Sequence, residues 1–289
     1  MKVKKAVIPA AGYGTRFLPV TKAIPKEMLP IVDTPTIEYI VKEALESGIK
    51  DILIIVSSNK NAIVDHFDRN FELEHMLKEK NKLDELEKIT SVTNECNIFF
   101  VRQKEQLGLG HAVLCAKEFV GNEPFALLLG DDLYVGEEKP ALKQLLEAYD
   151  KVESSVVGTL YVDDCDVSKY GICSLKDFRR LPLLELDALI EKPALEDAPS
   201  NLAIGGRYIL TPKIFELLET QKRGAGNEIQ LTDSINRLLD YEKVYSYEIS
   251  GRRYDIGSVY GFVDATLDFA LKREDIRDRI SDLIYKKRG

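Results

Sequence analysis

The sequence predicts an α/β protein with three layers, α/β/α, around a mixed, mostly parallel central sheet. Short apolar runs alternate along the chain with longer segments in which apolar residues recur at helical spacing. The first run, 6–8, is followed by a loop, a helix that starts at Thr34-Pro35 and ends at Gly48, and a second run at 51–57. This β-loop-α-β order predicts two parallel strands joined by a right-handed crossover.

Each later strand is predicted from an apolar or alternating run, and each later helix from an amphipathic segment. Strands are expected at 98–102, 125–129, 155–162, 171–175, 181–193, 203–210 and 244–249. Helices are expected at 112–119, 140–151, 213–219, 231–240, 259–271 and 274–287, with charged helical sequence at 59–88. No repeat or linker-like stretch interrupts the sequence, so residues 1–289 are expected to form a single domain.

The composition is typical of a soluble globular protein, with 45% hydrophobic and 30% charged residues. A formal net charge of −8 argues against a general nucleic-acid-binding protein. No stretch approaches the ~20 apolar residues that a membrane span needs. The N-terminus lacks an apolar signal region and the four cysteines lack metal-ligand spacing, so a cytoplasmic protein with reduced thiols is expected. His66 and His75 are expected on a solvated face.

The loop at 9–31 is the most informative stretch. Gly12 and Gly14 permit positive φ and leave bare main chain against a ligand, so successive N–H groups can point at phosphate oxygens. Positive charge is supplied beside them by Arg16, Lys22 and Lys26. The loop therefore predicts an anion site at the carboxyl end of the first strand.

Two common phosphate loops fit poorly. The P-loop needs a terminal Gly-Lys-Ser/Thr that is absent, and the dinucleotide motif needs a small residue where this chain has Phe17, followed by Pro19. Asp33 lies at the distance of a ribose-binding acid, but it does not follow the second long strand, at 51–57.

Two further strand ends carry polar residues. Gln103 follows the strand at 98–102 and offers both a donor and an acceptor, as the edge of a uracil requires, and Gly108 lets main chain close on a base. His111 is expected to be a helix-start contact. Asp131 ends a buried strand facing the phosphate loop, where a carboxylate suits Mg²⁺, and Asp132 is expected to be its exposed neighbour.

The motifs together resemble those of the sugar-1-phosphate nucleotidyltransferases, and several are typical of the uridylyltransferase branch. The signature is Gly-x-Gly-Thr-Arg-Phe-Leu-Pro at 12–19 with Pro-Lys-Glu-Met-Leu-Pro at 25–30. The similarity continues through segments 71–74, 102–116, 127–132, 168–171, 191–193, 198–210, 227–233 and 252–258. Members of the family usually carry one bulky apolar residue where this chain has Gly205.

The resemblance implies a Rossmann-like three-layer α/β/α nucleotidyltransferase fold. Residues 1–150 would bind mainly the nucleotide, 155–258 mainly the sugar phosphate, and 259–289 would form C-terminal helices. It implies that UTP and glucose 1-phosphate give UDP-glucose and pyrophosphate, with Mg²⁺ as the cofactor.

The resemblance also implies roles for individual residues. Catalytic roles fall on Arg16, Lys26, Asp131 and Lys192. Nucleotide-binding roles fall on Ala10, Ala11, Gly12, Gly14, Thr15, Gln103, Gly108 and Asp131. Sugar-binding roles fall on Gly171, Glu191, Lys192 and Ile204, and metal-binding roles on Asp131 and Asp255.

Two alternatives stay open at this point. A thymidylyltransferase would share the loop, the aspartates and Glu191-Lys192-Pro193, and would differ in its base and sugar pockets. A catalytically inactive regulatory homologue would bind sugar nucleotides without turnover. A homo-oligomer, either a dimer or a tetramer, is expected, with no nucleic-acid or membrane partner.

Overall fold

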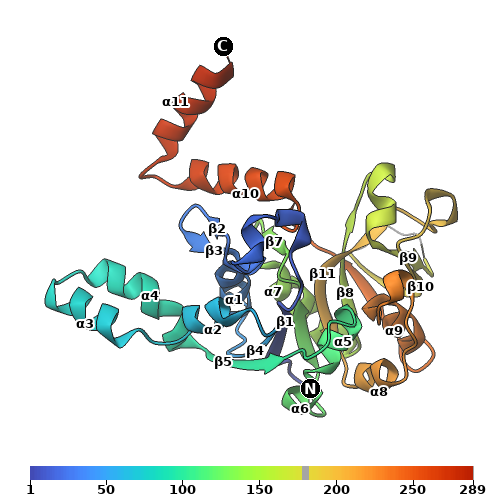
Figure 1. Ribbon diagram of the computed structural model, residues 1–289. Helices are drawn as coiled ribbons and strands as arrows, with labels where there is room; N and C mark the ends of the chain where they lie inside the picture. The colour runs from blue at the N-terminus through green and yellow to red at the C-terminus, as the bar shows by residue number, and fades with distance from the viewer. Residues whose placement is uncertain (178–181, 289) are drawn as a thin grey trace.

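The computed structural model describes residues 1–177 and 182–288, and its central element is a nine-stranded sheet (Figure 1). The strands lie in the order β5-β4-β1-β6-β11-β8-β12-β10-β9. Their bounds are β1 Lys5–Pro9, β4 Asp51–Val56, β5 Asn97–Arg102, β6 Phe125–Leu128, β8 Val156–Tyr161, β9 Gly171–Leu175, β10 Leu183–Glu191, β11 Leu202–Leu210 and β12 Tyr245–Glu248.

The sheet is mixed, but the prediction that it is mostly parallel is wrong. Neighbours among β5, β4, β1 and β6 are parallel, as are β8 and β12, whereas β11 pairs antiparallel with β6, β8 and β9, and β10 pairs antiparallel with β9 and β12. Parallel neighbours need a long crossover, and helices fill those connections in the N-terminal half. Further on, β9 leads to β10 over a short connection, which favours antiparallel pairing.

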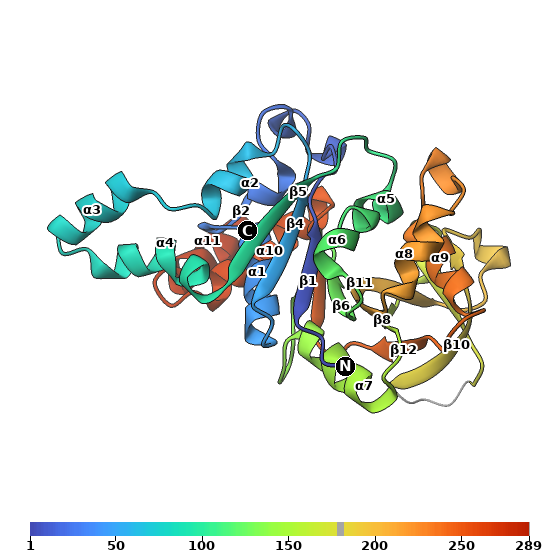
Figure 2. The ribbon, with the colours of Figure 1, turned by 90° about the horizontal axis from the view of Figure 1, so that it is seen from below.

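Helices cover the sheet on both faces. The helices of the described chain are α1 Thr36–Glu46, α2 Asn61–His66, α3 Phe71–Glu79, α4 Leu83–Glu95, α5 Leu109–Leu114, α6 Lys117–Val120, α7 Ala141–Val152, α8 Lys213–Glu219, α9 Leu231–Leu238, α10 Val259–Lys272 and α11 Arg277–Arg288, and not all of them lie on the sheet. Side chains alternate along β1, so Ala6 and Ile8 join one core cluster with α1 and α7, and Val7 joins the other with α5, α8 and α9 (Figure 2).

Several element boundaries differ from those expected. The helix predicted at 112–119 is two helices, α5 and α6, and the charged segment 59–88 forms three, α2 to α4. Thr34-Pro35 does not cap α1 with a side chain but forms β3 (Thr34–Pro35), which pairs with β2 (Pro30–Ile31). The strand predicted at 181–193 is β10, and position 181 lies outside the described residues.

A second ribbon was not predicted from the sequence. β7 (Asp132–Val135) pairs antiparallel with β13 (Arg252–Asp255), and Asp255 lies opposite Asp132 in this register. Because β7 begins directly after the turn that carries Asp131, this pairing brings residues 252–255 back to the end of β6.

The α3–α4 hairpin and helix α11 extend away from the sheet (Figure 1). Val263, Leu267 and Leu283, on the two C-terminal helices, are 43–50% exposed, so they do not belong to this chain's core. None of the described helices is long and apolar enough to cross a membrane. His75 is exposed as predicted, whereas the His66 side chain is only 24% exposed, and its Nε2 lies 2.9 Å from Glu38 Oε2.

Candidate active site

The carboxyl ends of β1, β5 and β6 open into a cavity of about 760 Å³. The N-terminal half of the chain lines it with Pro9, the Gly-rich loop, Lys26, Gln103, Gln106, Gly108 and Leu129–Asp132. The C-terminal half lines it with Lys169–Gly171, Glu191, Lys192, Ile204, Gly206, Tyr208, residues 228 and 230–232, Arg253 and Asp255. Residues from both halves of the chain therefore share a single cavity.

The Gly-rich loop folds back on itself around Gly14, whose φ of 68° is left-handed. A Cβ at this position would lie 3.2 Å from Thr21 Cγ2 and 3.3 Å from Lys26 Cβ, so a larger residue would be both strained and crowded. Thr21 Oγ1 donates to the Gly14 carbonyl over 2.8 Å and holds the fold-back. By contrast, nothing lies within 4 Å of a Cβ at Gly12, which leaves this main chain open to the cavity.

The fold-back brings Lys26 to Asp131, with 2.9 Å between Nζ and Oδ2. Burial alone would lower the pKa of Lys26, but the charges of Asp131 and Glu27 outweigh it and raise that pKa. Burial alone would likewise raise the pKa of Asp131, yet the charge and hydrogen bond of Lys26 hold it below the usual value. Both groups are therefore ionised at neutral pH.

Most of the predicted loop residues line the cavity: Ala11, Gly12, Gly14, Thr15 and Arg16. Ala10 does not, because its side chain is buried in the core cluster that contains α1. Lys22 is exposed and is absent from the cavity lining, so its charge is not part of this cavity.

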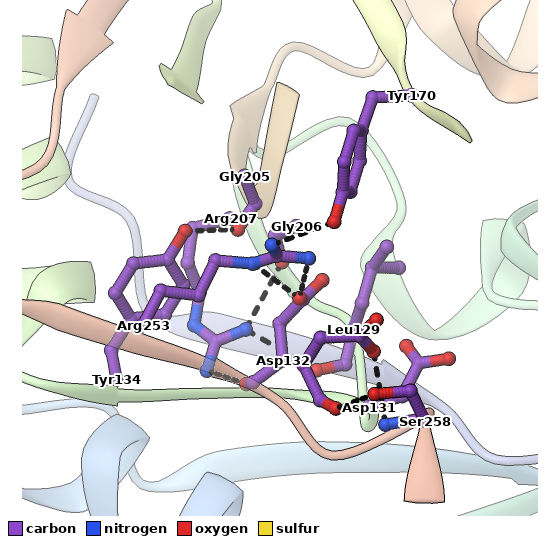
Figure 3. Close-up of polar contacts among 12 residues, drawn as sticks. Leu129, Asp131, Asp132, Tyr134, Tyr170, Gly205, Gly206, Arg207, Arg253 and Ser258 are labelled. Carbon is purple, nitrogen blue, oxygen red and sulfur yellow. Dashed lines mark hydrogen bonds and ion pairs between the residues drawn. The ribbon is translucent and has the colours of Figure 1, made fainter. Parts of the chain in front are cut away.

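Arg207 holds the turn that carries Asp131, and it is completely buried. Its guanidinium donates to the carbonyls of Leu129 over 3.2 Å, Gly206 over 3.1 Å and Asp132 over 2.7 Å (Figure 3). It also pairs with Glu43 over 2.8 Å. The backbone on both sides of Asp131 is thus fixed by one side chain from β11.

Asp132 is not the exposed neighbour that was expected, because only 6% of it is exposed. Its Oδ1 accepts from Arg253 Nε over 2.6 Å, and the same guanidinium donates to the Tyr170 hydroxyl over 3.1 Å (Figure 3). Pairing of β7 with β13 creates this contact, since it places Arg253 beside the strand that begins at Asp132. Asp132 therefore joins the two halves of the cavity wall instead of facing solvent.

Asp131 and Asp255 both lie beside Gly257. A Cβ at this glycine would be 3.1 Å from Asp131 Oδ2 and 3.1 Å from Asp255 Oδ1, so a side chain would fill the space next to the two carboxylates. No group of three or more His, Cys, Asp or Glu that could hold an ion is found in 1–177 and 182–288. Two carboxylates suit Mg²⁺, which binds one or two of them and completes its shell with phosphate oxygens and water.

Gln103 and Gly108 lie at the β5 end of the cavity. Gln103 is 5% exposed, and its Nε2 donates to the Gly108 carbonyl over 3.2 Å. Gly108 has a φ of 108°, and a Cβ there would come within 2.7 Å of Glu228 Cβ and 2.9 Å of the Ile229 carbonyl. Only glycine therefore lets this turn pack against residues 228–229.

The far side of the cavity contains Glu191 and Lys192, at the end of β10. Glu191 Oε2 accepts from Thr232 Oγ1 over 2.6 Å, and its Oε1 is 3.1 Å from Lys192 Nζ. Lys192 has a left-handed φ of 47°, unusual outside glycine, and its N–H donates to the Tyr170 carbonyl over 3.0 Å. That bond holds the strained residue so that its half-exposed side chain reaches the cavity.

Gly171 and Ile204 also line this side, as predicted. A Cβ at Gly171 would lie 2.8 Å from Ile204 Cδ1, so the glycine lets the two strands β9 and β11 close together under the cavity.

Residues 5–271 match the family described as nucleotidyl transferase. The chain belongs to this family. A UTP–glucose-1-phosphate uridylyltransferase of Staphylococcus saprophyticus is 55% identical over 286 residues, which cover 99% of this chain and 98% of the relative. A second relative with that name, from Staphylococcus haemolyticus, is 55% identical over 285 residues, 98% of each chain.

Solved structures agree with this family assignment. A UTP-bound UGPase from Acinetobacter baumannii is 41% identical with a TM-score of 0.91, over 98% of this chain and 99% of that one. A UDP-glucose pyrophosphorylase complexed with UDP-glucose is 44% identical with a TM-score of 0.86, over 94% of this chain and 100% of that one.

The structure explains why this nucleotidyl transferase family member has a glycine at position 205. Tyr134 Oη donates to the Gly205 carbonyl over 2.7 Å, and a Cβ at this position would collide with that hydroxyl. The Tyr134 side chain from β7 thus occupies the space that a larger residue at position 205 would need. Gly205 itself does not line the cavity.

Several residues that line the cavity were not singled out from the sequence: Tyr13, Gln106, Lys169, Thr232 and Arg253. Gln106 Nε2 donates to the Ala11 carbonyl over 2.8 Å and so ties the β5 loop to the Gly-rich loop. The only available signal was that all five fall inside segments that resemble the family, at 12–19, 102–116, 168–171, 227–233 and 252–258.

Proposed function

We propose that this protein transfers a uridylyl group from UTP to glucose 1-phosphate, forming UDP-glucose and releasing pyrophosphate. The observation that carries the proposal is the shared cavity, in which Arg16, Lys26 and Asp131 lie on one side and Glu191 and Lys192 on the other. The near-full-length similarity to curated uridylyltransferases supports the same reaction. A Rossmann-like three-layer arrangement is part of this proposal, supported by core clusters on both faces of the sheet.

The nucleotide would lie along the Gly-rich loop. Gln103 and Gly108 would bind the base, because a carboxamide and main-chain groups match the edge of a pyrimidine. Main chain at Gly12 and Gly14 would face the phosphates, where small residues permit close approach. Arg16, exposed on the loop, and Lys26 supply positive charge at this end.

The reaction is an in-line displacement at the α-phosphorus. A phosphate oxygen of glucose 1-phosphate forms the new P–O bond, and the bond from the α-phosphorus to the pyrophosphate oxygen breaks. Lys192 would position the attacking phosphate and Glu191 would bind the sugar hydroxyls, while Arg16 and Lys26 stabilise the charge on pyrophosphate as it leaves. The attacking phosphate oxygen carries no proton at neutral pH, so the protein needs no general base.

Asp131 and Asp255 would hold Mg²⁺, with Gly257 leaving room beside the two carboxylates. When bound, the ion supplies positive charge that neutralises nucleotide phosphate oxygens. Lys26, 2.9 Å from Asp131, keeps this carboxylate ionised and therefore ready to bind a cation.

Pyrophosphate release tests the proposed function. We expect rapid release with UTP and glucose 1-phosphate, slower release by roughly 10–200-fold with dTTP, since a pocket rejects an added methyl weakly, and background release with ATP or GTP. Equal use of dTTP would favour the thymidylyltransferase alternative, and no release with any pair would favour the inactive homologue. Galactose 1-phosphate in place of glucose 1-phosphate tests the sugar pocket in the same assay.

Lys192→Ala should raise the KM for glucose 1-phosphate by about 10–100-fold, since a charge-assisted hydrogen bond contributes about 1.5–3 kcal/mol. The KM for UTP should change little, because Lys192 follows β10 and the Gly-rich loop follows β1, and these strands lie on opposite sides of β11 in the sheet. Steady-state kinetics with each substrate varied in turn measures both values.

Arg16→Ala is the matched contrast for Lys192→Ala. We expect it to lower kcat more than it raises either KM, since its charge is most useful as pyrophosphate departs. If Lys192→Ala changed only the KM for UTP, the assignment of the two sides of the cavity would be wrong.

A further inference from the structure

The carboxamide of Gln103 has a second partner that the base-binding role does not require. Its Nε2 lies 3.2 Å from the Gly108 carbonyl oxygen and 3.0 Å from His111 Nδ1. A carbonyl oxygen only accepts, so the Gln103 group in contact with it must be the NH₂. The two NH₂ hydrogens are then donated to Gly108 and His111.

This arrangement determines the state of His111. Because its Nδ1 accepts a hydrogen bond, the imidazole is neutral and carries its proton on Nε2. It also determines where Gln103 Oε1 points, since both sides of the NH₂ are occupied. In the described part of the chain Oε1 has no hydrogen-bond partner, although Gln103 itself lines the cavity.

His111 contacts Gln103 from outside the cavity. It is not among the cavity-lining residues, and it lies in the first turn of α5, while Gln103 directly follows β5. Both ends of the contact are anchored. The Gln103 N–H donates to the Val56 carbonyl over 2.9 Å, and the N–H of Gly110, which precedes His111, donates to the Ile229 carbonyl over 2.8 Å.

We propose that His111 is a positioning residue that holds the Gln103 carbonyl toward the nucleotide base, and thereby makes the site select uracil over cytosine. Uracil presents a donor, N3–H, which the carbonyl accepts. Cytosine presents an acceptor at N3 and would face the same carbonyl with two lone pairs opposed. This inference rests on the proposed function and adds the residue that sets its choice between pyrimidines.

The orientation would be lost without His111. A flipped carboxamide would place Oε1 against the Gly108 carbonyl, which loses that hydrogen bond, and it would keep a hydrogen bond to His111 only if the imidazole moved its proton from Nε2 to Nδ1. Without His111, only the Gly108 carbonyl holds the carboxamide in place. The carboxamide can then flip and present its NH₂ to the base, where it can donate to N3 of cytosine.

The test compares kcat/KM for UTP and for CTP, with glucose 1-phosphate as the second substrate. In His111→Phe we expect the UTP:CTP ratio to fall about tenfold, equivalent to one hydrogen bond of about 1.4 kcal/mol. His111→Asn should restore most of the ratio, because its Oδ1 can accept from Gln103 where Nδ1 did. His75→Phe, on an exposed face of α3, is the control and should leave the ratio unchanged.

A ratio that is unchanged in His111→Phe, or one that His111→Asn lowers as much as His111→Phe, would overturn the proposal. Should His111→Phe fail to fold, nitrogen-15 NMR of the unmodified protein decides: we expect the proton of His111 on Nε2, and a proton on Nδ1 would contradict the inference. Absence of pyrophosphate release from UTP in the unmodified protein would instead overturn the proposed function.

Discussion

Asp131→Asn should fold like the unmodified protein and lose about 10²–10³-fold in kcat, the scale seen when one preorganised electrostatic group is removed. The carboxylate is ionised and is paired with Lys26, 2.9 Å away, and an amide of the same shape can neither balance that charge nor bind Mg²⁺ well. Pyrophosphate release measured across a range of Mg²⁺ concentrations checks this, and we expect the variant to need more Mg²⁺ for half-maximal rate.

Asp278→Asn provides the control, since this aspartate is 90% exposed on α11 and makes the same chemical change far from the cavity. It should leave both kcat and the Mg²⁺ requirement unchanged. Asp132→Asn is unsuitable as a control because Asp132 is buried against Arg253. Full turnover in Asp131→Asn would remove Asp131 from the proposed metal site.

Arg207→Met should lower the free energy of unfolding by about 3–5 kcal/mol, the usual cost of leaving one partner of a buried ion pair alone. Arg207 is 0% and Glu43 is 7% exposed in the side chain, and their contact is 2.8 Å. The substitution also removes the donors to the Leu129, Gly206 and Asp132 carbonyls, so kcat should fall as the turn around Asp131 loosens. Chemical denaturation measures the first effect.

The double variant Glu43→Leu/Arg207→Met should recover much of the lost stability, because the unpaired buried charge is gone. Recovery is incomplete, since the Leu142 N–H loses Glu43 Oε1 as its acceptor, 2.9 Å away. Lys213→Met, in the exposed pair with Glu216, should change stability by less than about 1 kcal/mol. A cost below about 1 kcal/mol for Arg207→Met itself would show that the buried pair is not a main source of stability.

Local sequence pattern was enough to predict most strands and the Gly-rich loop. Apolar runs such as 6–8 and 125–129 are β1 and β6 in the structure. A strand that is covered on both faces buries all of its side chains, so its sequence is a continuous apolar run. Gly14 was predictable for the same kind of reason: its left-handed φ is a property of one residue and its nearest neighbours.

Most residues of the candidate site could be named from the sequence, but the direction in which each side chain points could not. Arg16, Lys26, Asp131 and Lys192 all line the cavity, as the resemblance implied. Ala10 does not, because the alternation of side chains after β1 turns it into the core, and one residue's shift along an extended chain reverses the face.

Asp132 illustrates what the sequence could not determine. A second acid after a strand is usually exposed, and nothing nearby in the chain offers it a partner. Its partner Arg253 is 121 residues away and reaches it only through the pairing of β7 with β13. A four-residue strand of mixed polarity such as β13 has no distinctive pattern, so neither the ribbon nor the ion pair could be read in advance.

The sequence by itself determined the family-like loop, the order of most strands and helices, and the chemistry offered at the strand ends, because each depends on residues close together in the chain. Tertiary structure alone decided which strands run antiparallel, the burial of Asp132, and the contact of His111 with Gln103. It also decided the pairing of Arg207 with Glu43, 164 residues apart. A buried polar group needs a hydrogen-bond partner, and the fold decides which residues become its neighbours. Local sequence does not show which distant residues these are.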